Sequence, residues 1–302
     1  MPNIGDSERK TQNRVVKFFQ KKLHYTYLGN LHDSENRNIM QERLHTWLVG
    51  QGYSDKLASN AVDALVKAAT NLQQGLYHAN KEVYSLLKYG AKAKETADQS
   101  PKTVYFIDFE DVAKNDFYIA EEVTVVGGNT KRPDLVIYVN GIALAVIELK
   151  RSQVSVSEGI RQNLTNQKAN FIEQFCTTMQ FCMAGNDSEG RRYGTLLTPE
   201  KHYLEWKQDG FTQFQEERDE TDILIEDVSK TIPNKLDMQI YAMFHKKRFL
   251  DLIHNFVIFD KGIKKVCRYN QYYAIKRAQH RLMDKQRGGI VLHPQGSGKS
   301  LT

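Results

Sequence analysis

The sequence is poor in cysteine and has no long apolar segment. Its 302 residues include three cysteines, Cys176, Cys182 and Cys267. An odd number without Cys-x-x-Cys spacing argues against a disulfide framework or a zinc site, so buried, reduced thiols are expected. No apolar run approaches the ~20 residues that a membrane-spanning helix needs, and the N-terminus lacks the basic and apolar regions of a secretory signal. A globular cytoplasmic protein is therefore the expectation.

The composition supports packed cores and a polyanionic partner. Hydrophobic residues make up 40% of the chain and aromatic residues 10%. The net charge is +6 and the pI about 9.0, which suits nucleic acid because lysine and arginine release counterions when they neutralise phosphates. Many proteins that never bind nucleic acid are equally basic, so the charge alone does not assign a function.

The pattern along the chain changes near residue 103. Before it, apolar residues recur at helical spacing and predict four helices, at residues 7–23, 38–49, 55–70 and 77–90. After it, short runs rich in β-branched and aromatic residues alternate with turn signals and predict strands at 104–107, 121–126, 135–139 and 142–149. A helix spanning Ile160 to Phe175 and two further apolar runs follow. The expected fold class is α/β, with a mixed central sheet flanked by helices.

Residues 205–235 contain an acidic run and a proline and are expected to form a domain boundary. We predict an endonuclease domain with a helical N-terminal part at residues 1–230. Residues 231–302 would hold linker helices at 236–254 and 270–285 and the start of an ATPase domain.

Three ionic residues lie at the outer ends of two apolar runs. Asp134 precedes the first run, and Glu148 and Lys150 close the second. Charged groups at buried strand ends are costly unless they pair or bind a metal, and carboxylate oxygens suit Mg²⁺. We expect Asp134 and Glu148 to hold Mg²⁺, and Lys150 to orient the attacking water or offset negative charge during phosphodiester hydrolysis. Hydrophilic strand ends without a metal are the alternative.

The turn between these runs decides whether the two carboxylates share a face, since side chains alternate along a strand. A two-residue loop at Asn140-Gly141 would pair Asp134 with Ile147 and turn Glu148 to the opposite face. A three-residue loop with a left-handed glycine bulge would pair Asp134 with Val146 and make Glu148 a diagonal neighbour on the same face. We predict that bulged loop or an equivalent strand distortion.

Pro133, Asp134, Glu148 and Lys150 resemble the motif of the PD-(D/E)xK nucleases. The resemblance implies two Mg²⁺-binding acidic residues and a catalytic lysine. Several branches of that family add an acidic residue on the first helix, for which Glu8 is the candidate metal ligand here. Capping of the helix N-terminus is the alternative role for Glu8.

The next helix carries part of a Gln-x-x-x-Tyr element found in type I restriction subunits. Gln162 matches the glutamine and is a candidate catalytic residue, with an exposed helical glutamine as the alternative. Asn166 stands where the tyrosine is expected, which puts a role for that second position in doubt.

The C-terminal segment reads as a short strand, residues 289–292, followed by a glycine-rich loop that ends in Lys-Ser. In such a loop backbone N–H groups face a triphosphate, the lysine reaches the β- and γ-phosphates and the serine coordinates Mg²⁺. The loop resembles the first motif of superfamily 2 helicases, whose adenine-reading Q motif resembles the segment around Gln271. The expected ATP-binding residues are Gln271, Gly296, Ser297, Gly298, Lys299 and Ser300.

The order of these motifs, nuclease and then helicase motor, is similar to the R subunit of type I restriction enzymes. That resemblance implies ATP-driven DNA translocation, Mg²⁺-dependent cleavage of double-stranded DNA, and modification and specificity subunits as partners. We expect a fragment without a complete ATPase, because the chain stops at Thr302. Two alternatives stay open: a docking module with a degenerate nuclease fold, and a free-standing structure-specific nuclease.

Overall fold

A six-stranded mixed sheet organises the chain. The structure is a computed structural model that describes residues 8–96, 98–207, 234–283 and 290. The sheet has the order β1-β4-β5-β6-β7-β8, in which β1/β4 and β6/β7 are parallel and the other neighbours antiparallel. Its strands are β1 (Thr26–Asn30), β4 (Phe117–Glu121), β5 (Leu135–Val139), β6 (Ile142–Leu149), β7 (Phe181–Asn186) and β8 (Gly190–Gly194). The expected mixed α/β class is confirmed.

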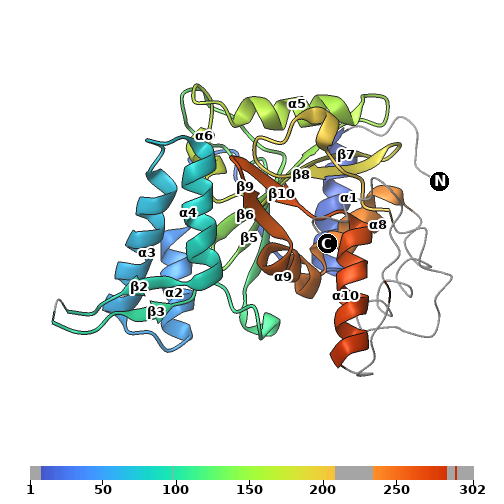
Figure 1. The fold of residues 1–302 in the computed structure, drawn as a ribbon. Helices are drawn as coiled ribbons and strands as arrows, with labels where there is room; N and C mark the ends of the chain where they lie inside the picture. Colours follow the sequence, from blue (N-terminus) through green and yellow to red (C-terminus); the bar gives the residue numbers. More distant parts are fainter. Residues whose placement is uncertain (1–7, 97, 208–233, 284–289, 291–302) are drawn as a thin grey trace.

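The four N-terminal helices form where helical spacing predicts them. They are α1 (Glu8–Lys21), α2 (Gln41–Gly50), α3 (Asp55–Thr70) and α4 (Leu76–Tyr89). The start of α3 is fixed by Ser54, whose side-chain oxygen accepts a hydrogen bond from the backbone N–H of Leu57. Figure 1 shows α2, α3 and α4 beside one another and α1 on the opposite side of the molecule. A small hairpin, β2 (Ala91–Ala93) with β3 (Lys102–Val104), contacts α3.

Side chains of β5 alternate between two apolar clusters. Leu135, Ile137 and Val139 lie in a large cluster with residues of α1, α8 (Lys235–Phe244) and α9 (Lys246–Asn255), whereas Val136 and Tyr138 lie in a smaller one with residues of α6 (Glu173–Cys176). All eight residues of β6 are buried. Such continuous burial is expected for a central strand that is covered on both faces.

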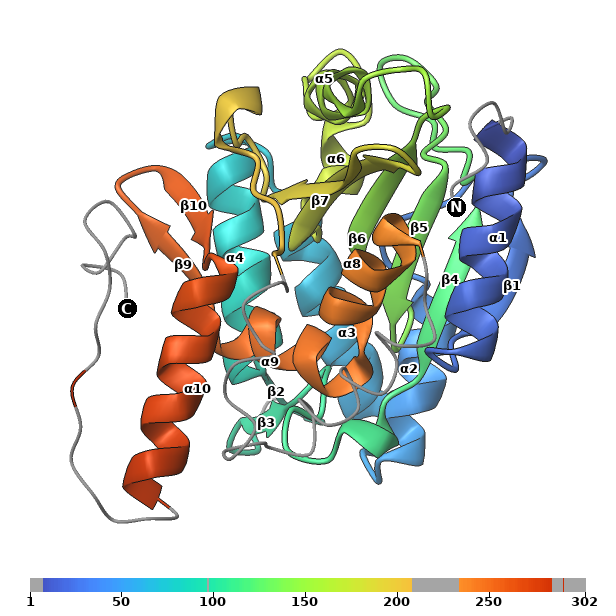
Figure 2. The same ribbon diagram turned by 90° about the vertical axis from the view of Figure 1, so that its right-hand side faces the viewer.

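The C-terminal elements pack onto the same large core. They are α8, α9, the hairpin β9 (Val257–Asp260) and β10 (Ile263–Val266), and α10 (Tyr269–Met283), and Figure 2 shows α8 and α9 in front of the sheet. Phe244 and Phe249 are fully buried in the large cluster. Tyr84 of α4 donates a hydrogen bond to the carbonyl of Ile253. The proposed boundary near residue 230 lies outside the described residues and stays a prediction.

Several predicted elements differ from the structure. The strand expected at 121–126 is wrong: β4 lies earlier, at Phe117–Glu121, and the strand ends where Glu122 adopts a left-handed φ of +50°. The strand expected at 104–107 is also wrong, because the strand in this region is β3, which lies earlier and ends at residue 104. Strand β1 was not predicted; it is short, and its register shifts between Tyr27 and Gly29.

Two predicted helices are interrupted. The helix expected at 236–254 is divided into α8 and α9 by His245, whose ψ of 122° is extended, and buried Arg248 donates to the carbonyl of Ala242 at the break. The helix expected from Ile160 to Phe175 is divided into α5 (Val156–Asn166) and α6 by a turn in which the carbonyl of Asn166 accepts from the N–H of Ile172.

The expected thiols are confirmed: Cys176 and Cys182 are buried, Cys267 is partly buried, and all three are free. In the part of the chain that the structure describes, none of the helices combines the length and apolarity needed to cross a membrane.

Candidate active site

A distorted hairpin brings Asp134 and Glu148 together. The loop has two residues, Asn140 and Gly141, both with positive φ, so Val139 pairs with Ile142 and the three-residue loop that we predicted is wrong. The equivalent distortion is present instead, because the register shifts within the hairpin and Ile137 pairs with Ala145.

The distortion is a bulge in β6. Leu144 and Ala145 both point into the large core cluster, although they are neighbours in sequence. After this extra residue Leu135 pairs with Ile147, and the next position along each strand holds Asp134 and Glu148. The two carboxylates are therefore directly opposite on one face of the sheet, and not diagonal neighbours as predicted.

Both carboxylates are buried and held by named donors. Asp134 is 8% exposed and Glu148 fully buried. Oδ2 of Asp134 accepts from the backbone N–H of Leu149 at 2.7 Å. Oε2 of Glu148 accepts from Nε2 of Gln162 at 2.7 Å, and its Oε1 lies 3.5 Å from Nδ2 of Asn166. Helix α5, which carries both amides, lies over one end of the sheet (Figure 2).

Burial makes both groups poor anions on their own. Desolvation raises the pKa of Asp134 to about 6, partly offset by the hydrogen bond from Leu149 and the charge of Lys150. Desolvation, followed by repulsion from Asp134, raises the pKa of Glu148 well above its usual value. Two adjacent carboxyl groups that resist ionisation together are the arrangement that a cation between them would stabilise.

Lys150 and Glu8 complete one side of this pair. The side chain of Lys150 is 14% exposed, and its Nζ lies 3.9 Å from Oε1 of Glu8 at the start of α1. Lys150 is two residues beyond Glu148 and therefore projects on the same side. The structure thus brings together Asp134, Glu148, Lys150, Gln162 and Glu8.

The donor set fits a hard divalent cation. Among the residues described, no three His, Cys, Asp or Glu side chains converge closely enough to hold a metal, so such an ion would depend on the Asp134 and Glu148 pair. Mg²⁺ is commonly bound through one or two carboxylates while it retains several waters. Beside the pair, Oδ1 of Asn166 is buried and accepts no hydrogen bond from the residues that the structure describes, so it could accept one from a metal-bound water.

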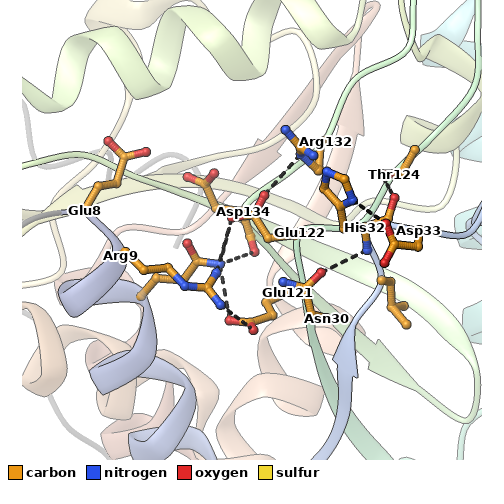
Figure 3. Close-up of polar contacts among 12 residues, drawn as sticks. Glu8, Arg9, Asn30, His32, Asp33, Glu121, Glu122, Thr124, Arg132 and Asp134 are labelled. Atoms are coloured by element: carbon orange, nitrogen blue, oxygen red, sulfur yellow. Dashed lines mark hydrogen bonds and ion pairs between the residues drawn. The ribbon is translucent and has the colours of Figure 1, made fainter.

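A chain of ion pairs borders the carboxylate pair and was not predicted from the sequence. Glu121 accepts from Arg9, Gln12 and Tyr27, and the neighbouring Glu122 contacts both Arg9 and Arg132 (Figure 3). Arg132 could have been noticed, because it precedes Asp134 by only two residues in the sequence. The contribution of Arg9 depends on how α1 packs against β4, for which the sequence carries no signal.

The predicted nucleotide site is only partly described. Gln271 is buried in the first turn of α10, where its Oε1 accepts from the backbone N–H of Arg268 at 2.7 Å. Residues 291–302, which include the glycine-rich loop, lie outside the described residues. The expected ATP contacts stay a prediction.

Comparison with known proteins identifies the family of this chain. The family model "Type I restriction enzyme R protein N terminus" matches residues 5–202, about two thirds of the chain. The chain belongs to this family. The match covers β4 to β7 and α5, the elements that carry the carboxylate pair and its amide donors.

Curated relatives share the family over most of this chain. A Methanocaldococcus jannaschii protein that carries the name of the type I restriction enzyme MjaIXP endonuclease subunit is 27% identical over 262 residues, 78% of this chain and 24% of the relative. The type I restriction enzyme HindI endonuclease subunit of Haemophilus influenzae is 28% identical over 265 residues, 82% of this chain and 24% of the relative. The chain therefore spans about a quarter of the length of the relatives it matches.

Proposed function

We propose that this chain carries the nuclease centre of a type I restriction endonuclease subunit and hydrolyses phosphodiester bonds of double-stranded DNA with Mg²⁺. The observation that supports this most strongly is the buried Asp134 and Glu148 pair on adjacent strands, with Lys150 on the same face. The arrangement resembles the PD-(D/E)xK nucleases. The names of the curated relatives, as endonuclease subunits of type I restriction enzymes, support the same assignment.

Each side chain then has a defined task. Asp134 and Glu148 would hold Mg²⁺, which when bound polarises the scissile phosphate and lowers the pKa of a water molecule. Lys150 would orient that water or stabilise the negative charge that develops on the phosphate. Gln162 donates a hydrogen bond to Glu148 and so fixes the orientation of that carboxylate. Glu8 lies beside Lys150 and stays a candidate only for a contact to the metal through a water molecule, since it does not converge with the carboxylate pair.

The complete protein would add a motor to this centre. We propose that residues 231–302 begin a superfamily 2 helicase domain, with a RecA-like fold, that binds ATP through Gln271 and the loop at Gly296, Ser297, Gly298, Lys299 and Ser300. The full-length enzyme would act in the cytoplasm, where it would couple ATP-driven translocation to cleavage and assemble with modification and specificity subunits. Base recognition would then lie in a partner, and this chain would contact mainly the DNA backbone.

The test is cleavage of supercoiled plasmid, with and without Mg²⁺, ATP and the partner subunits, by the wild type and by Asp134→Asn, Glu148→Gln and Lys150→Ala. Each variant should lose Mg²⁺-dependent nicking by at least about a hundredfold while it keeps DNA binding. Glu95→Gln, on the remote β2–β3 segment, should cleave like the wild type. Undiminished cleavage by Asp134→Asn would exclude this site, and absence of cleavage in the assembled wild-type complex would favour a docking module. Cleavage without ATP or partners would favour a free-standing nuclease.

A further inference from the structure

Two half-exposed arginines flank the carboxylate pair and share one glutamate. Nε of Arg132 lies 3.1 Å from Oε2 of Glu122, and NH1 of Arg9 lies 3.6 Å from Oε1 of the same carboxylate. NH2 of Arg9 also donates to Glu121 at 3.0 Å. The side chains of Arg9 and Arg132 are 50% and 43% exposed, whereas that of Glu122 is 23% exposed. Figure 3 shows these residues around Asp134.

The two arginines lie near the same end of β5 and β6 as the proposed catalytic groups. Arg132 precedes Asp134 by two residues, in the segment that leads into β5, and Figure 3 shows both beside Glu122. Arg9 follows Glu8 in the first turn of α1. The backbone N–H of Glu122 donates to the carbonyl of Asp134 at 2.9 Å, which fixes the shared glutamate next to the metal-binding pair.

Fold stability does not account well for this arrangement. Ion pairs between exposed arginines and a carboxylate typically contribute little, and α1 is already held by buried Val15 and Phe19. A planar guanidinium with a free face suits a phosphate oxygen as well as a carboxylate. Glu122 therefore occupies the place that an anionic ligand of the two arginines would take.

We propose that Arg9 and Arg132 bind backbone phosphates next to the scissile one. In the DNA-free protein Glu122 pairs with both arginines, and the phosphates replace it when DNA binds. The proposal rests on the proposed function, because it says how the DNA backbone is bound at the nuclease site. The nearby Glu121 stays paired with Gln12 and Tyr27, so α1 keeps its contact with β4 when Arg9 turns to DNA.

The test measures binding of a short fluorescent DNA duplex by anisotropy, in EDTA, over a series of KCl concentrations. Binding without metal separates this inference from cleavage. Arg9→Ala and Arg132→Ala should each weaken binding severalfold and reduce the slope of log K against log salt by about 0.9, the value for one lost phosphate contact. Glu122→Gln should bind severalfold more tightly, because the arginines lose their competing charge.

Controls separate DNA contact from a structural role. Lys102→Ala, in an exposed ion pair with Glu95 on the β2–β3 segment, should leave the affinity and the salt slope unchanged. Arg9→Lys and Arg132→Lys keep the charge and should retain most of the slope, even if loss of the guanidinium lowers thermal stability. Unchanged slopes in both alanine variants would overturn the proposal, and so would weaker binding by Glu122→Gln.

The two hypotheses fail in different ways. A wild-type chain that never cleaves but shows the predicted salt slopes would refute the proposed function and leave a DNA-binding surface at these arginines. If the wild type cleaves through Asp134 and both arginine variants bind DNA normally, only the phosphate-binding role of Arg9 and Arg132 would be refuted.

Discussion

Gln162 donates from Nε2 to Oε2 of Glu148 at 2.7 Å, across the gap between helix α5 and strand β6. The bond orients one carboxylate of the pair and leaves its other oxygen directed toward Asn166 at 3.5 Å. Without this hydrogen bond the Glu148 side chain could rotate. It would also protonate more readily, since burial opposes its charged form. The amide therefore links the helix to the chemistry of the strand.

Gln162→Ala should reduce Mg²⁺-dependent cleavage by about 10- to 100-fold, the range typical when a group that orients a metal ligand is removed. The loss should lie mainly in the apparent affinity for Mg²⁺, which a Mg²⁺ titration of the nicking rate would measure. The neighbouring Arg161 is exposed on α5 and pairs with Glu200, so Arg161→Ala should have no such effect. A Gln162→Ala enzyme with normal Mg²⁺ dependence would show that the bond is dispensable.

The sequence identified the residues of this site better than their geometry. Alternating and continuous apolar runs, with ionic residues at their ends, pointed to Asp134, Glu148 and Lys150. The same reasoning placed the required distortion in the loop, whereas it lies at Leu144 and Ala145 inside β6. A bulge between two aliphatic residues of a buried strand has no local sequence signal, because both strand faces accept apolar side chains.

The interruptions of helices were equally hidden. The apolar spacing of residues 236–254 continues through His245, yet the chain there is extended and Arg248 caps the end of α8. That arrangement depends on a buried guanidinium supplied from the following helix. Tertiary contacts of this kind override local periodicity, and they can only be seen once the elements are assembled.

Asp134→Asn should stabilise the metal-free protein at alkaline pH. The folded-state pKa of Asp134, about 6, lies above its usual value of 3.8, so stability present below that lower value is lost as pH rises through 6. Asparagine removes the charge and keeps an acceptor for the Leu149 N–H. The expected gain is about 1–3 kcal/mol at pH 8 and should shrink as the pH falls below 6.

Urea unfolding in EDTA at pH 8 and pH 5 would measure this difference. Asp63→Asn, at an exposed position of α3, should change stability by less than about 0.5 kcal/mol at either pH. Equal stability of Asp134→Asn and the wild type at pH 8 would mean that solvent or a counterion already screens the carboxylate pair.

Mg²⁺ should stabilise the wild type in the absence of DNA. Binding to the folded state alone adds about 2.7 kcal/mol at a hundred times the dissociation constant, and the affinity should rise with pH because both carboxylates must lose their protons. Glu148→Gln and Asp134→Asn should lose this stabilisation. Thermal unfolding over a Mg²⁺ series at pH 6 and pH 8 would measure it, and an equal gain in all three proteins would place the ion elsewhere.

Lys264 attaches the β9–β10 hairpin to α4 and to the segment that precedes β7 through a buried ammonium group. Its Nζ donates to Oδ1 of Asn80, the carbonyl of Met179 and Oε1 of Gln180 at 2.7–3.0 Å, and the side chain is almost fully buried. These three acceptors take all three protons of the group, so its removal leaves buried oxygens without a donor.

Lys264→Met should therefore lower the free energy of unfolding by about 2–4 kcal/mol, although methionine fills much of the same space. Lys265→Met is the matched control, because the side chain of Lys265 is one-third exposed and pairs with Asp260, so the expected loss is below about 1 kcal/mol. Denaturant unfolding would compare the two. Equal losses would show that the buried contacts of Lys264 add nothing to the attachment of the hairpin, and that the apolar contacts of Phe256 and Val257 hold it in place.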